Sequence, residues 1–335
     1  MPPENNQSSI NVGNVGNVGH VSNAVNAGRG YALAASAAVL WGLSGTASKY
    51  LLSHQVRPSD LLAIRTAIAA TLIFIWLALT SPRLLRVSRA DLPYFLILGV
   101  VGLAAHQFLY YLALERTSVG FALLLAYTAP IFLMAYGLLA KTERMTPGKA
   151  LAALTAISGC VLMVFGQAGG IGSASLSGAA FAIASAILFA FYSVYSQRGL
   201  RRYDARTMLA YIFLASSIGW LVFRPPWTWP VRSYDPTIWS VLLYLSSVVT
   251  LLPFGMYLAS LRHIEASRAN LTSMIEPVMA TALAWLWLGE QMQPMQIAGG
   301  AAVLCGVLLL QIESLMLARR ITERIQQPID RHDPP

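Results

Sequence analysis

A glutamate and a proline stand side by side in the middle of an apolar run, as Glu276 and Pro277 of the stretch LTSMIEPVMATALAWLWLGEQ. The apolar neighbours make a charged carboxylate costly, and the proline removes a helix hydrogen bond. A carboxylate in such a place can couple a proton or bind a substrate amine. It can also accept hydrogen bonds from backbone donors near Pro277. The residue types leave both interpretations open.

Two other ionisable side chains, Arg65 and His106, interrupt apolar runs. A charged residue at the centre of a membrane helix costs about 2.5–3.5 kcal/mol on insertion scales, so we expect each to face a wet cavity or a polar partner. Arg65 can extend toward the membrane surface, form an ion pair inside the protein, or contact substrate. His106 can pack between helices through one bonded nitrogen, or it can line a cavity.

Aromatic and polar side chains accompany these groups at helical spacing. Gln107, Tyr110 and Tyr111 are spaced i, i+3 and i+4, which places them on one helix face. Other side chains are candidates for substrate contact, and for each aromatic one the alternative is packing or lipid contact. These further candidates are Trp41, Ser44, Tyr127, Tyr192, Tyr195, Thr250, Phe254, Tyr257, Asn270, Ser273 and Met274.

The composition indicates an integral membrane protein. Of 335 residues, 56% are hydrophobic and 11% are charged, and the mean hydropathy is +0.58. Soluble domains carry about 25% charged residues. Residues 1–30 are rich in Asn, Gly and Ser, so we predict a disordered tail without a removable signal peptide. Cys160 and Cys305 show no metal-ligand spacing, and we expect neither a metal nor a cofactor.

Ten segments are apolar enough and, at about 20 residues, long enough to cross a membrane. The connections between them are short, which leaves no room for a soluble catalytic domain. The segments are 31–53, 58–80, 91–114, 117–140, 147–166, 175–198, 204–223, 236–260, 266–288 and 294–317. We therefore predict an all-α protein of ten transmembrane helices in the lipid bilayer.

The 23 Lys and Arg residues predict the orientation of these helices. Seventeen lie in the terminal segments or beside the connections after the second, fourth, sixth and eighth spans, and five lie on the opposite side. By the positive-inside rule, both termini face the cytoplasm, including the C-terminal tail 318–335. Topology thus explains the net charge of +9, and we expect no nucleic-acid partner.

The chain resembles itself at an offset of 147 residues. Tyr110 aligns with Tyr257, for example, and no gap is needed over about 50 residues. This predicts two five-helix repeats, residues 31–166 and 175–317. Because five is odd, the second repeat must be inverted relative to the first. Inverted repeats are typical of transporters and enclose a central cavity at the membrane midplane.

Three prolines lie in the interior of predicted spans, away from their first turn. Pro130 aligns with Pro277 in the repeat, and Pro253 lies in the eighth span. Each removes an i to i−4 hydrogen bond and allows two half-helices to tilt separately, so we predict that all three are hinges. Ala129 stands where the second repeat has Glu276, so the two repeats are not chemically equivalent at this point.

Two stretches resemble EamA-type carriers of the drug/metabolite transporter superfamily. They are RANLTSMIEPVMATALAWLWLGEQMQPMQIAGGAAVLCGVLLL (268–310) and AVLWGLSGTASKYLL (38–52). The aromatic-rich third and eighth spans are most similar to bacterial aromatic amino acid exporters. The resemblance implies a secondary transporter of the bacterial inner membrane that works by alternating access in the direction of export. It also favours a structural role for Glu276, because carriers with very different substrates have a Glu-Pro pair here.

The predicted cavity has aromatic walls and few fixed charges. No Lys–Arg or Lys–Lys pair lies deep in a span, as a carrier of phosphorylated solutes would need. The sequence therefore favours a small amphipathic substrate, first an aromatic amino acid and alternatively a flat aromatic or cationic drug. A membrane enzyme or a channel is a remote alternative. No catalytic constellation can be assembled for an enzyme. A channel would favour a pore lined by rings of like groups, and saturable counterflow would exclude it. We expect a monomer or a weak homo-oligomer.

Overall fold

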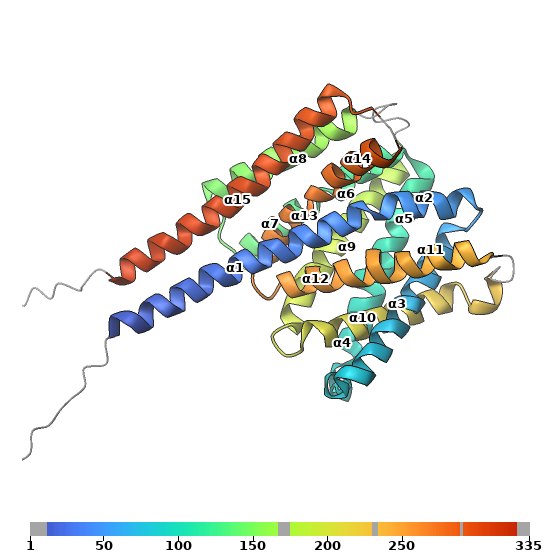
Figure 1. Ribbon diagram of the computed structural model, residues 1–335, viewed down its shortest axis with the longest axis horizontal. Helices are drawn as coiled ribbons and strands as arrows, with labels where there is room; N and C mark the ends of the chain where they lie inside the picture. The colour runs from blue at the N-terminus through green and yellow to red at the C-terminus, as the bar shows by residue number, and fades with distance from the viewer. Residues whose placement is uncertain (1–11, 167–174, 230–233, 289–290, 327–335) are drawn as a thin grey trace, which may run out of the picture.

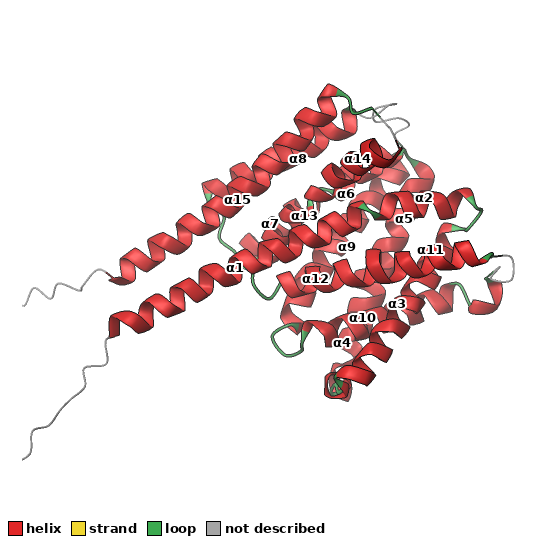
Figure 2. Cartoon of the chain, viewed as in Figure 1, coloured by secondary structure: helices red, strands yellow, loops and turns green. Residues whose placement is uncertain are grey.

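The secondary structure is entirely helical, without a strand, in the residues that the computed structural model describes, which are 12–166, 175–229, 234–288 and 291–326 (Figure 2). Eight helical segments are long and apolar enough to cross a membrane. They are Pro58–Thr80, Arg89–Arg116, Gly120–Leu139, Pro147–Phe165, Leu176–Gly199, Ala205–Phe223, Pro236–Ser260 and Pro294–Leu317. The chain is therefore an all-α membrane protein.

The helices are named in chain order. In the first half they are α1 (Val12–Gly42), α2 (Ser44–Ser53), α3 (Pro58–Thr80), α4 (Leu92–Ile97), the π-helical segment η3 (Leu98–Ala105), α5 (His106–Arg116), α6 (Val119–Ala126), α7 (Ala129–Leu139) and α8 (Pro147–Phe165). In the second half they are α9 (Leu176–Gly199), α10 (Ala205–Phe223), α11 (Pro236–Ser246), the π-helical segment η6 (Ser247–Leu251), α12 (Leu252–Ser260), α13 (Ala266–Ser273), α14 (Ile275–Leu288) and α15 (Pro294–Gln326).

Local signals fix where several helices begin. A proline in the first turn costs little, because the N–H that it lacks would be unpaired there in any case. Four helices begin in this way, at Pro58, Pro147, Pro236 and Pro294. Side chains also cap helix starts: the Asp235 carboxylate accepts a hydrogen bond from the backbone N–H of Ile238 at 2.8 Å. These signals explain why several predicted starts coincide with the observed ones.

Two of the predicted hinge prolines lie where a helical path breaks. Pro130 is the second residue of α7, which follows α6, and Pro277 lies in the first turn of α14, which follows α13. Neither proline has an N–H to donate to the carbonyl four residues earlier, so an unbroken helix cannot be maintained there. The two breaks are equivalent in the repeat, since Tyr127 and Met274 are 147 residues apart.

Hydroxyl groups satisfy backbone carbonyls beside both breaks. Thr128 donates to the carbonyl of Leu125 at 2.6 Å, and Ser273 donates to the carbonyl of Ala269 at 3.0 Å. The third predicted hinge, Pro253, lies in the first turn of α12, directly after the π-helical segment η6. The helical paths therefore depart from regular α-helix near all three prolines.

The ends of the chain contain more helix than we predicted. Residues 12–30 belong to α1, where we predicted a disordered tail, and residues 1–11 lie outside the described part. Packing explains the last turn of this extension, because a Cβ on Gly30 would lie only 2.8 Å from Cγ2 of Ile264. At the other end, α15 continues to Gln326.

The helices form a bundle in which both chain ends emerge on the same side (Figure 1). We call this side the termini end. Helix α1 packs against α12, α13 and α14, while α9 packs against α5, α6 and α7, and α10 packs against α3 and η3. The connections at the termini end bond to one another: Tyr203 donates to Asp91 at 2.5 Å, and Arg262 donates to Asp204 at 3.1 Å.

Glycines bring α8 and α15 into backbone contact along one edge of the bundle (Figure 1). A Cβ on Gly159 would lie 2.6 Å from the carbonyl oxygen of Gly299, and a Cβ on Gly299 would lie 2.6 Å from the carbonyl oxygen of Gly159. Two turns further along α15, a Cβ on Gly306 would lie 2.7 Å from the backbone nitrogen of Ala156. Small residues of this kind allow membrane helices to associate through close van der Waals packing.

Gly299→Ala is expected to force α8 and α15 apart and to lower stability by about 1–3 kcal/mol, the usual cost of overpacking. Gly300 is a matched control, because the nearest atom to its Cβ would be Cγ1 of Val278 at 3.5 Å. Gly300→Ala should be neutral or stabilising, since alanine is the better helix former. The measurement is thermal unfolding in detergent, and equal melting temperatures for the two variants would contradict the packing argument.

Candidate functional site

Five aromatic rings meet where α1, α9 and α12 pack together. The centroid of the Trp41 ring lies 5.2 Å from that of Phe254, 5.5 Å from Tyr257 and 6.5 Å from Phe189. Tyr192 joins them, with its centroid 5.9 Å from Phe189 and 6.1 Å from Phe254. We call these five residues the aromatic cluster. Several pairs are edge-on, an arrangement that the aromatic quadrupole favours.

The rings of the aromatic cluster differ in exposure. Trp41 and Phe189 are half-buried, whereas the exposed fractions of Tyr192 and Tyr257 are both 0%. The Tyr257 hydroxyl is hydrogen-bonded to the Ser193 hydroxyl at 2.8 Å, which fixes its ring against α9. Trp41 and Phe189 thus keep part of their ring surface accessible, whereas Tyr192 and Tyr257 are fully enclosed.

The sequence analysis singled out four of the five residues but missed Phe189. A signal for it was present, because Phe189 precedes Tyr192 by three positions and therefore shares its helix face.

His106 is bonded to α9. Its Nδ1 lies 2.9 Å from the hydroxyl oxygen and 3.0 Å from the carbonyl oxygen of Ser185. The Ser185 hydroxyl also lies 3.0 Å from the carbonyl oxygen of His106, to which it can donate. The His106 ring packs against Phe189, with centroids 5.0 Å apart, and the adjacent Gln107 is buried. These contacts join α5 to α9 and orient the Phe189 ring.

Glu276 lies in the first turn of α14 and is half-buried. It takes part in none of the ion pairs among the described residues. The Glu276 carboxylate lies close enough to interact electrostatically with three other groups, which are the hydroxyls of Tyr110 and Tyr127 and the thiol of Cys160. A Cβ on Gly42 would lie 3.2 Å from its backbone carbonyl, so α1 passes close to this turn.

Arg65 does not pair with Glu276. It lies within electrostatic range of His106, and its buried Nε has no hydrogen-bond partner in the described part of the chain. The two opposite charges predicted inside the bundle are therefore separate features.

The other predicted residues occupy four environments. Tyr195 stacks on Tyr94, with centroids 4.4 Å apart, near the termini end. The Tyr111 hydroxyl donates to the exposed Glu115, one turn along α5. Buried between helices are Thr250, Asn270, Ser273 and Met274. Half-buried are Ser44, Tyr110 and Tyr127.

A second polar site, which the sequence analysis did not predict, lies at the termini end. Lys149, with an exposed fraction of 1%, donates to Glu143 at 2.6 Å and to Glu265 at 2.8 Å. Glu143 also accepts a hydrogen bond from the Ser267 hydroxyl. Glu143 follows α7 and Ser267 lies in the first turn of α13, so these bonds join the two halves of the chain.

Arg268 extends this site. Its Nη1 donates to Glu313 at 2.7 Å, and its Nε donates to Glu265 at 3.1 Å. The Thr146 hydroxyl also donates to Glu313, at 2.7 Å. We call Glu143, Lys149, Glu265, Arg268 and Glu313 the ion cluster. Each of its charges has an opposite partner, as buried charges require.

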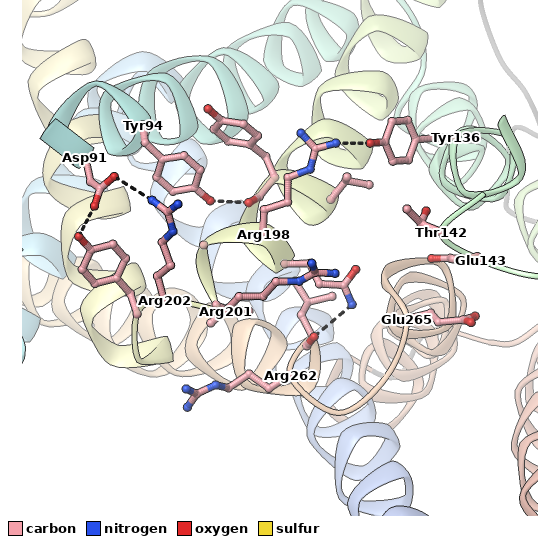
Figure 3. A pocket seen from close by; sticks show the side chains of 17 residues that line it. Asp91, Tyr94, Tyr136, Thr142, Glu143, Arg198, Arg201, Arg202, Arg262 and Glu265 are labelled. Carbon is pink, nitrogen blue, oxygen red and sulfur yellow. Dashed lines mark hydrogen bonds and ion pairs between the residues drawn. The ribbon is translucent and has the colours of Figure 1, made fainter. Parts of the chain in front are cut away.

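A pocket of about 810 Å³ lies at the termini end beside the ion cluster (Figure 3). Four arginines, three carboxylates and four tyrosines line it: Arg198, Arg201, Arg202, Arg262, Asp91, Glu143, Glu265, Tyr94, Tyr136, Tyr195 and Tyr203. Figure 3 shows Glu143 and Glu265 on one side and Asp91 with Arg202 on the other. In the described part of the chain, no group of three His, Cys, Asp or Glu side chains could hold a metal ion.

Two loop groups beside the pocket have shifted pKa values. The hydrogen bond to Asp91 raises the pKa of the Tyr203 hydroxyl. Burial acts to raise the pKa of Asp204, but hydrogen bonds from Arg206 and the charges of Arg206 and Arg262 together hold that pKa below its ordinary value. Asp204 is therefore a stable counter-charge for Arg262.

Comparison with known proteins gives the family. The sequence profile of the EamA-like transporter family matches the chain twice, over residues 28–165 and 176–312. The chain belongs to the EamA-like transporter family. Because the two matches divide the chain between α8 and α9, each of them contains one of the two proline-associated breaks.

Similar proteins are also named as transporters. The uncharacterized inner membrane transporter YicL of Salmonella typhimurium is 27% identical over 290 residues, which are 84% of this chain and 95% of that protein. A probable terminal-alkyne amino-acid exporter of Streptantibioticus cattleyicolor is 29% identical over 230 residues, 67% of this chain and 75% of that one. A crystal structure with 22% identity has a TM-score of 0.74 and covers 87% of this chain and 98% of its own, so it shares the fold. This EamA-family protein is a membrane transporter.

Lys149→Met is expected to lower the stability of this EamA-family protein by about 3–5 kcal/mol, the usual cost of removing one partner from a buried ion pair. Lys141→Met is the matched control, because Lys141 lies at the same end of the bundle but is exposed. Thermal unfolding in detergent measures the difference.

The double variant Lys149→Met with Glu143→Gln should lose less than the sum of the two single changes, because the second change removes a charge that the first leaves unpaired. Additive losses would contradict the pairing.

Proposed function

We propose that this protein is a secondary transporter that exports aromatic amino acids by alternating access. The observation that carries the proposal is the aromatic cluster, in which Trp41 and Phe189 present half-buried ring faces between α1, α9 and α12. Stacking of a flat side chain there gains about 0.5–1.5 kcal/mol per ring pair beyond area burial. The similar protein named as a probable amino-acid exporter supports the amino-acid class.

The proposal includes ten spans in two inverted repeats. The paths α1–α2 and α13–α14 supply two spans in addition to the eight candidate segments. The units are residues 31–166 and 175–317. Their equivalent breaks, and the recurrence of a π-helical segment as η3 and η6, support the duplication. Five crossings carry the chain to the other side, so the second unit faces the opposite way.

The termini end faces the cytoplasm in this proposal. Its pocket contains four arginines, and cytoplasmic surfaces of membrane proteins are enriched in such residues. Substrate would then enter from the termini end and leave at the other end. The similar protein from Salmonella typhimurium that is named an inner membrane transporter supports a location in the inner membrane.

Efflux from proteoliposomes tests the function. Vesicles that contain the protein are loaded with labelled phenylalanine, tryptophan or lysine. We expect saturable efflux of the two aromatic amino acids above that of empty vesicles, and none of lysine. Saturation and counterflow distinguish a carrier from a channel. Efflux of a flat cationic dye without efflux of phenylalanine would replace the proposal with drug export, and efflux of neither would overturn it.

Trp41→Ala should raise the half-saturation concentration for phenylalanine about tenfold, the equivalent of about 1.4 kcal/mol of lost ring contact. Trp227→Ala is the control, because Trp227 is 84% exposed and lies outside the aromatic cluster. Equal half-saturation concentrations for the two variants would argue against binding at the cluster.

Pro130→Ala and Pro277→Ala should each slow turnover roughly three- to tenfold with little change in half-saturation. Alanine restores one backbone hydrogen bond, worth about 0.5–1.5 kcal/mol, across a break that must flex during the cycle. The check is the maximal rate of phenylalanine efflux from proteoliposomes. Unchanged turnover in both single variants would contradict a hinge role.

A further inference from the structure

The pocket at the termini end has the size of a small-molecule site. Its volume of about 810 Å³ lies within the range of roughly 300–1,000 Å³ that is common for ligand pockets. Tyr94 and Tyr195 stack on each other in its wall, and Tyr136 lies across from them (Figure 3). The pocket therefore combines aromatic surface with charges of both signs.

Arg198 and Arg201 have hydrogen-bond donors without a carboxylate partner among the described residues, unlike the other two arginines of the pocket. Arg202 faces Asp91 at 3.5 Å, and Arg262 is bonded to Asp204. By contrast, Arg198 donates only to the neutral Tyr136 hydroxyl, and Arg201 forms no ion pair among the described residues. Both arginines lie between the two acidic sides of the pocket (Figure 3). Each guanidinium group has the donor geometry that suits a carboxylate.

The side of the pocket away from Asp91 has an excess of negative charge. Glu143 and Glu265 line it, and both belong to the ion cluster. That cluster contains three carboxylates, those two and Glu313, but only two cations, Lys149 and Arg268. One further cation can therefore be accommodated beside Glu143 without leaving a charge unpaired.

We propose that this pocket is an entry site that binds the zwitterionic head of an α-amino acid, with the carboxylate on Arg198 and Arg201 and the ammonium on Glu143. The inference rests on the proposed export of amino acids and adds a site separate from the aromatic cluster. A zwitterion fits better than an anion or a cation alone, because each of those leaves one side of the pocket without its partner.

Binding at this pocket acts on the contacts between the two halves of the chain. Glu143 accepts hydrogen bonds from Lys149 and from the Ser267 hydroxyl, and Lys149 also bonds to Glu265. An ammonium group on Glu143 competes with these donors and loosens the link between α7 and α13. A ligand shifts a conformational equilibrium by its difference in affinity for the two states. Entry of substrate therefore favours separation of the halves at the termini end.

The test measures binding of labelled phenylalanine to the full chain in detergent, together with proteoliposome efflux. Phenethylamine has only the ammonium and 3-phenylpropionate only the carboxylate, so each should compete at least tenfold more weakly than unlabelled phenylalanine. Arg201→Gln should weaken binding at least tenfold and raise the half-saturation concentration for substrate supplied at the termini end. Arg83→Gln is the control, because Arg83 is exposed and outside the pocket.

Glu143→Gln should weaken phenylalanine binding while leaving competition by 3-phenylpropionate unchanged. If this variant unfolds because Lys149 loses a partner, Arg201→Gln alone decides the question.

Equal binding by Arg201→Gln and Arg83→Gln would overturn the entry site even if the unmodified protein exports phenylalanine. Binding that depends on Arg201 without any efflux would support the site and reject the proposed function. If inorganic phosphate or phosphatidylglycerol displaces the label and the two single-charge analogues match phenylalanine, the pocket is an anion or lipid site and the proposal fails.

Discussion

Inside a bilayer, every backbone N–H and C=O must find its partner within the protein, and this constraint decides where the chain can depart from regular helix. The breaks beside Pro130 and Pro277 are tolerated because Thr128 and Ser273 donate to nearby carbonyls and because α9 and α1 pack against these paths. A helix that faced lipid could not break in this way. The irregular backbone therefore lies inside the bundle, where it can border a substrate path.

Charged side chains are also costly inside the bilayer unless they find partners within the protein. Inside the bundle, Glu276 and Arg65 do not pair with each other among the described residues. The paired charges that join the two halves lie at the termini end instead, in the ion cluster. In the proposed alternating-access cycle, opening that end requires these pairs to separate, which is costly unless other charges replace them. A ligand with both an ammonium and a carboxylate supplies such charges, so under the proposed entry site recognition and opening involve the same groups.

Much of the helical framework follows from local sequence. Helix α3 matches the predicted span 58–80, and the breaks follow from two prolines, because hydropathy and a missing N–H act over a few residues. The ion cluster could not be predicted in this way, since Lys149 and Glu265 are 116 positions apart and a single sequence carries no signal for their pairing. Composition predicts a disordered tail for residues 1–30, and residues 12–30 are helical in the structure; the packing of Gly30 against Ile264, which composition cannot reveal, accounts for the last turn of this extension. The site residues have known positions, while their roles in binding stay predictions.

The equivalent breaks in the two halves differ in one side chain, and helix electrostatics give that difference a consequence. Helices α7 and α14 both begin just after a break, with unpaired N–H groups and a partial positive charge at their first turn. In α14 this turn contains Glu276, whereas in α7 the equivalent position is Ala129. A carboxylate there stabilises the start of α14, and an alanine gives α7 no such support. We therefore predict that Glu276 acts first on the helix that carries it, so that a ligand cation approaching Glu276 would compete with that role. The two halves can share one architecture and still respond unequally to the same substrate.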